Sequence, residues 1–102
     1  MAGAIVQPEC RLGDNIIVNT GAQIDHDCII GNHVHIAPGA ILSSGVRVGK
    51  MSHVGAGATV IQNITIGDES MIAAGAVVVR DVPNKAQVAG VPANLVKYNE
   101  LE

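Results

Sequence analysis

Aromatic side chains are almost absent from this sequence of 102 residues: Tyr98 stands alone, with neither Phe nor Trp. A hydrophobic core must therefore be built from Val, Ile, Leu and Ala, which favours a thin and regular interior. Runs of Lys or Arg are also missing, and the formal net charge is −3, which argues against nucleic acid or an anionic membrane surface as a partner. No apolar stretch approaches the roughly 20 residues of a membrane-spanning helix. We therefore expect a cytoplasmic protein.

The two cysteines lack the close spacing, such as C-x-x-C, that is typical of metal sites. Twelve Gly and four Pro indicate frequent turns within what the length suggests is one small domain. The sequence therefore directs attention to short elements that repeat.

An apolar residue recurs at every sixth position over most of the chain. The series is Val6, Leu12, Val18, Ile24, Ile30, Ile36, Leu42, Val48, Val54, Val60, Ile66, Ile72 and Val78. Two residues before each member lies a small or aliphatic residue, such as Cys10, Val34 or Ala58. Side chains two apart in a strand share one face, so both series predict an interior and the residue between them points outward.

A third series marks where the chain bends. Of its fourteen positions from 3 to 81, ten hold Gly, Asn or Asp, the residue types that best tolerate a positive φ. Each six-residue unit is thus a short strand followed by a corner. An amphipathic helix has a period of 3.6 residues and is excluded. The pattern predicts a solenoid of stacked parallel strands.

This frame places the histidines. His26 lies at a corner between Asp25 and Asp27, and a carboxylate that bonds one ring nitrogen raises the basicity of the other. His35 is mid-strand and projects outward, with His53 one coil further on, whereas His33 occupies another corner. Nine residues separate His26 from His35, which is half a circuit if a coil has about 18 residues. A catalytic pair would therefore have to form between two chains.

Three stretches carry a resemblance to a known family. They are D-H-D-C-I-I-G-N-H-V-H-I-A-P-G, S-H-V-G-A-G-A-T-V, and A-A-G-A-V-V-V-R-D-V-P followed by A-G-V-P-A. With the six-residue period, the chain up to about Lys97 resembles the hexapeptide-repeat acetyltransferases. Within that family, the three stretches resemble the C-terminal domain of bacterial sialic-acid O-acetyltransferases and UDP-amino-sugar N-acetyltransferases.

The resemblance implies an all-β fold, a left-handed parallel β-helix of triangular section with about four coils over residues 1–82. A C-terminal loop and tail would occupy residues 83–102. It also implies a homotrimer. The family's N-terminal Rossmann-like module, which holds the sugar nucleotide, has no counterpart in these 102 residues.

The resemblance further implies an acetyl-CoA-dependent acetyltransferase that acts on an amine or hydroxyl of a sugar or sugar nucleotide. His26 would be the general base, Asp27 would support it, and His35 of the adjoining subunit would contact the acetyl group. Transfer would be direct, with no Cys or Ser nucleophile. No metal is expected.

Acetyl-CoA would lie along the prism, against small residues and towards positive charges near the end of the chain. The expected contacts are His35, Ser44, Gly55, Ala56, Ala73, Ala74, Arg80, Gly90, Pro92 and Lys97. Positive charge at Arg80 and Lys97 would meet the nucleotide phosphates.

Two other functions fit the same period. A non-catalytic module that forms trimers would need no reactive histidine. A zinc enzyme resembling the γ-class carbonic anhydrases would use histidines across the subunit interface, although the closely spaced His pair of that class is missing.

Overall fold

The structure, a computed structural model, describes residues 3–99, and within this range it consists of short β-strands and turns without a helix. The strands are β1 (Ile5–Val6), β2 (Arg11–Leu12), β3 (Ile17–Val18), β4 (Gln23–Ile24), β5 (Ile29–Ile30), β6 (His35–Ile36), β7 (Ile41–Leu42), β8 (Arg47–Val48), β9 (His53–Val54), β10 (Thr59–Val60), β11 (Thr65–Ile66), β12 (Met71–Ile72), β13 (Val77–Val78), β14 (Ala86–Ala89) and β15 (Asn94–Tyr98). Over the described residues, no helix is long and apolar enough to cross a membrane.

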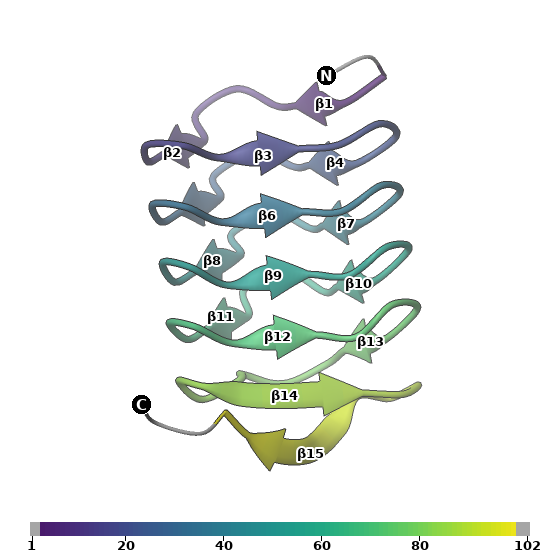
Figure 1. Ribbon diagram of the computed structural model, residues 1–102. Helices are drawn as coiled ribbons and strands as arrows, with labels where there is room; N and C mark the ends of the chain where they lie inside the picture. Colours follow the sequence, from purple (N-terminus) through teal and green to yellow (C-terminus); the bar gives the residue numbers. More distant parts are fainter. Residues whose placement is uncertain (1–2, 100–102) are drawn as a thin grey trace.

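Successive strands belong in turn to three sheets, which form the sides of a prism (Figure 1). Sheet 1 has the order β1-β4-β7-β10-β13, and sheet 2 has the order β11-β8-β5-β2. Sheet 3 has the order β15-β14-β12-β9-β6-β3. Pairing between coils is parallel, and the chain winds as a left-handed parallel β-helix of about five turns. The predicted fold class is therefore confirmed.

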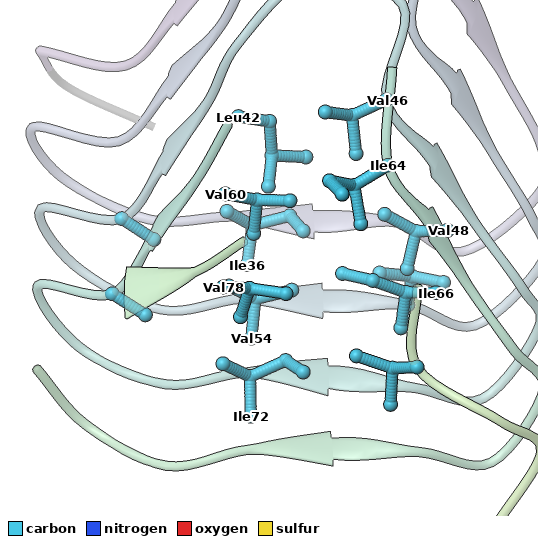
Figure 2. Packing of buried hydrophobic residues seen from close by; sticks show 14 of the residues in the cluster. Ile36, Leu42, Val46, Val48, Val54, Val60, Ile64, Ile66, Ile72 and Val78 are labelled. Atoms are coloured by element: carbon cyan, nitrogen blue, oxygen red, sulfur yellow. The ribbon is translucent and has the colours of Figure 1, made fainter. Parts of the chain in front are cut away.

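The core consists of the two apolar series that the sequence analysis identified. Strand register is offset by eighteen residues, as in Ile24 opposite Leu42, so inward side chains stack in columns along the axis (Figure 2). Ile36, Val54 and Ile72 form one such column. Ser52 and Ser70 are the buried polar side chains of the described range, and each hydroxyl donates to a carbonyl oxygen, of Gly67 and Pro83 respectively, at 2.7 Å. Their burial therefore leaves no hydroxyl without a partner.

The bends have positive φ at every sixth residue from Gly3 to Gly75. Glu9, His33, Met51 and Glu69 adopt this conformation although their side chains disfavour it. Stacking on the neighbouring coils therefore overrides local preference at these four corners. Asp81, which the repeat also placed at a bend, has no positive φ.

The two ends of the prism differ. At the N-terminal end the inward residues Val6 and Leu12 remain 40% and 45% exposed, because no earlier coil lies against them in the described chain. At the other end β14 pairs in parallel with β12, and β15 folds back antiparallel onto β14 (Figure 1). The structure thus differs from the expected four coils with a loop and tail after residue 82, since β14 continues sheet 3 into a further turn.

Adjacent residues of β5 provide a direct test of the alternation. Ile30 points inward and is 1% exposed, whereas Ile29 points outward and is half-buried. Ile30→Ala should lower the free energy of unfolding by about 2–5 kcal/mol, because it leaves a cavity in a packed core. Ile29→Ala should lower it by less than about 1 kcal/mol. Urea denaturation measures both, and equal losses would contradict the assigned faces.

Candidate active site at two corners of the prism

His26 lies at the corner where the chain leaves β4 of sheet 1 and enters β5 of sheet 2. Its Nδ1 is 3.0 Å from Oδ2 of Asp27, and Asp27 reaches this position because it adopts the positive φ of the bend. The backbone N–H of His26 donates to Oδ1 of Asp25 at 2.8 Å, which holds the second carboxylate beside the ring. The predicted carboxylate–histidine contact is therefore present.

This contact determines what His26 can do chemically. A carboxylate accepts, so in the neutral ring the proton lies on Nδ1 and the lone pair lies on Nε2. The hydrogen bond to Asp27 is the main cause that raises the pKa of His26 above 6.5; desolvation opposes it, and the charges of Asp25, Asp27 and Glu9 add to the rise. His26 is exposed, and its Nε2, which lies 4.0 Å from Oδ1 of Asp25, is the ring's proton acceptor.

His35 projects from sheet 3, as predicted for a mid-strand outward residue. Its ring centroid is 4.6 Å from that of His53, which is its partner in the parallel register. Burial is the main cause that lowers the pKa of His53 below 6.5, and electrostatic repulsion from His35 is the second cause. The Nε2 of His35 is 2.6 Å from Nδ2 of Asn19 on the preceding coil.

The analysis of the sequence did not single out Asn19. It precedes His35 by sixteen residues, whereas the stacking period is eighteen, so column arithmetic does not pair the two. The sequence held one signal for this contact. Asn19 is a polar residue just beyond β3, at the corner next to the outward His35.

The structure keeps His26 and His35 apart within one chain. His26 occupies the corner between sheets 1 and 2, and His35 stands on sheet 3, which is the side of the triangle opposite that corner. The half-circuit separation expected from the sequence therefore holds. A site that uses both rings requires two copies of the chain.

The residues expected to contact acetyl-CoA divide between two corners. Ser44 and Arg80 follow His26 along the corner between sheets 1 and 2, at multiples of eighteen residues. The corner between sheets 3 and 1 holds Gly55, Ala56, Ala73 and Ala74, with Gly90 and Pro92 beyond β14 at its end. Lys97 lies on β15 opposite Gln87, and its side chain is exposed.

A hollow on sheet 2 adjoins the His26 corner. It is lined by Glu9, Cys10, Arg11, Asp27, Ile29 and Arg47. Two arginines thus lie on the same side of the prism as the carboxylate that contacts His26.

The cysteines point inward, as predicted for members of the series that lies two residues before each sixth-position apolar residue. Both are free thiols, and Cys28 is buried. Burial raises the pKa of Cys28 to about 11, which keeps it a thiol and a poor nucleophile. Within residues 3–99, no three His, Cys, Asp or Glu side chains are grouped as metal ligands.

Proton NMR titration tests the electrostatics of the His26 corner. The His26 ring should titrate with a midpoint above 6.5, because Asp27 stabilises the imidazolium, whereas His53 should titrate below 6.5. Asp27→Asn should move the His26 midpoint down, and the control Asp25→Asn should move it less, because Asp25 acts only through its charge. Equal shifts in the two variants would contradict the assigned hydrogen bond.

Comparison with known proteins places the chain in a family. The sequence profile described as "Bacterial transferase hexapeptide (six repeats)" matches residues 9–44 and 45–80. No curated protein matches the chain. Among solved structures, the acetyltransferase domain of PglB from Neisseria gonorrhoeae is 47% identical with a TM-score of 0.93, and the match covers 94% of this chain and 47% of that one. The same domain has been solved in complex with acetyl coenzyme A.

Two further relatives differ from each other in the molecule that is named with them. PerB from Caulobacter crescentus, in complex with CoA and GDP-perosamine, is 38% identical with a TM-score of 0.83, over 93% of this chain and 55% of that one. Serine acetyltransferase of Neisseria gonorrhoeae is 34% identical with a TM-score of 0.91, over 98% of this chain and 43% of that one. The chain thus spans about half the length of these relatives. From the profile match and these identities, the chain belongs to the bacterial transferase hexapeptide family.

Proposed function

We propose that this chain is the catalytic β-helix of an acetyltransferase that moves the acetyl group of acetyl-CoA to an amine or hydroxyl of a sugar nucleotide. The observation that carries the proposal is the His26–Asp27 contact, which makes Nε2 of His26 the proton acceptor of the neutral ring. Relatives of the same fold bind acetyl coenzyme A, or CoA together with GDP-perosamine, according to their descriptions. These ligands support the same donor and acceptor class here.

The reaction needs one proton acceptor and one hydrogen-bond donor. Nε2 of His26 removes a proton from the acceptor's amine or hydroxyl as that group attacks the thioester carbonyl. His35 or a backbone N–H donates to the carbonyl oxygen, where negative charge develops. The tetrahedral intermediate then expels the CoA sulfur, which takes up the proton held on Nε2 of His26, and the product is an amide or ester. No enzyme nucleophile is used, in keeping with the thiol state of buried Cys28.

A ring of three chains would bring the two histidines together. The outer face of sheet 1 is bordered on one side by the His26 corner and on the other by the corner that begins directly after His35. If sheet 1 of each chain faces a threefold axis, the His26 corner of one chain meets the His35 corner of the next. Exposed Ile5 and Ile41 on the outer face of sheet 1 supply apolar contact for this arrangement.

The same ring would bring together the residues that are expected to bind acetyl-CoA. Ser44 and Arg80 extend from the His26 corner of one subunit, while Gly55 and Ala73 line the opposing corner of its neighbour. Small residues there let the pantetheine arm approach the backbone closely. Arg80, and Lys97 on β15, lie towards the C-terminal end, where they would meet the nucleotide phosphates.

The hollow on sheet 2 is suited to the acceptor. Arg11 and Arg47 offer guanidinium groups to a diphosphate, and Asp27 lies between them and the catalytic corner. A sugar nucleotide would thereby place its sugar next to His26. Arg11 and Arg47 would hold the diphosphate, while the carboxylates of Glu9 and Asp27 in the same lining would face the sugar.

Replacement of His26 tests the function. His26→Ala should lower kcat for transfer to a nucleotide-linked amino sugar by about 10²–10⁴-fold, since general-base catalysis is worth that much. Acetyl-CoA affinity should change little, because His26 acts on the acceptor. Release of the CoA thiol gives the rate, and isothermal titration calorimetry gives the affinity.

His33→Ala is the matched control, because His33 lies on the same coil at the corner between sheets 2 and 3, away from the proposed groove. It should retain wild-type activity. A His26→Ala protein with unchanged kcat would refute the role of His26. A wild-type protein that does not bind acetyl-CoA would instead indicate the non-catalytic module.

A further inference from the structure

Asn19 makes two contacts on the coil that follows it. Its Nδ2 is 2.6 Å from Nε2 of His35 and 3.4 Å from the carbonyl oxygen of Ile36. The residue lies just beyond β3, at the corner between sheets 3 and 1, and is partly buried. It therefore touches His35 at the nitrogen nearest the preceding coil.

The Ile36 carbonyl, which also accepts from the backbone N–H of Asn19 at 3.0 Å, indicates which end of the amide faces His35. A carbonyl oxygen only accepts, so the amide group directed at it must be the NH₂ donor and not the amide oxygen. The two hydrogens of Nδ2 are then shared between Ile36 O and Nε2 of His35. Nε2 is consequently an acceptor without a proton of its own.

We infer that Asn19 is a positioning residue, which holds His35 as the neutral tautomer with its proton on Nδ1. The inference rests on the proposed function, in which His35 donates to the acetyl oxygen. Nδ1–H is the group that remains for this task once Nε2 is occupied. Asn19 thereby decides which ring nitrogen is presented to the ligand, without touching the ligand itself.

The Asn19 contact is specific to a ring that has no proton on Nε2. Protonation of Nε2 would set an N–H against the NH₂ group of Asn19 and break the bond. His53 is the titratable side chain that follows His35 in the outward column of sheet 3, at a centroid distance of 4.6 Å. The remaining neighbours in that column, Ile17 and Met71, carry no charge.

Nitrogen-15 NMR of the ring nitrogens reads the tautomer directly. In the wild-type chain above the pKa of the ring, Nε2 of His35 should resonate as an unprotonated nitrogen and Nδ1 as a protonated one. Asn19→Ala should shift the population towards the Nε2–H form, which free histidine prefers. A wild-type ring already in the Nε2–H form, or a variant with an unchanged tautomer, would overturn the inference.

Asn84→Ala is the matched control for loss of an asparagine that links two coils, because Asn84 Oδ1 accepts from the backbone N–H of Asp68 far from His35. It should leave the His35 tautomer unchanged. If it changed the tautomer as much as Asn19→Ala does, the effect would be general loosening of the stack and the inference would fail.

Asn19→Asp gives the opposite electrostatic outcome. A carboxylate only accepts, so Nε2 of His35 must then carry the proton, and the pKa of the ring should rise. Above that pKa the neutral ring has no proton on Nδ1, so we expect kcat for acetyl transfer to fall there by about 10²-fold, the order of one lost oxyanion donor, with the affinity for acetyl-CoA unchanged. Wild-type kcat in Asn19→Asp would refute the inference and leave the role of His26 intact. Conversely, a His26→Ala protein of full activity would refute the proposed function while the tautomer data stand.

Discussion

Parallel pairing at a constant offset of eighteen residues determines the direction of every side chain in this solenoid. Ile24 lies opposite Leu42, and Leu42 lies opposite Val60. Each inward residue therefore packs on another inward residue. A slip of one residue would turn every inward Val, Ile and Leu to the solvent. Burial of each such side chain is worth about 1.5–3 kcal/mol, which makes this register strongly preferred.

The same register distributes the reactive groups around the prism. A side chain at a corner can extend away from the backbone ladder, whereas one in mid-strand is confined to a flat face. His26 belongs to the first class and His35 to the second, and they lie on opposite sides of the triangle. Under the proposed function, each chain therefore supplies half of a catalytic site at two places, and a neighbouring copy completes each half.

The period predicted most of the fold because one rule, inward at every sixth residue, applies without interruption from Val6 to Val78. Strand positions, the faces of His26, His35 and His53, and the inward cysteines all follow from it. The rule ends when Val78 is followed six residues later by Asn84, so the continuation of sheet 3 through β14 could not be read from it. There the pairing with β12 decides the structure, not a sequence repeat.

Side-chain detail was beyond the pattern for a different reason. The Asn19–His35 bond joins residues sixteen apart, and it depends on rotamers that lean from one column into the next. Met51 and Glu69 adopt a positive φ because the stacked coils require a bend there. Their residue types alone do not predict this conformation. Contacts between coils, in other words, override local preference at specific corners.

A mixing experiment tests most directly whether the site is shared between copies. Chains with His26→Ala and chains with His35→Ala are expected to be nearly inactive when each is prepared alone. In a ring of three, co-expression of the two in equal amounts pairs an intact His26 with a neighbour's intact His35 at about a quarter of the sites, so about a quarter of wild-type activity should return. A mixed preparation as inactive as its components would contradict a site built across the boundary between two subunits.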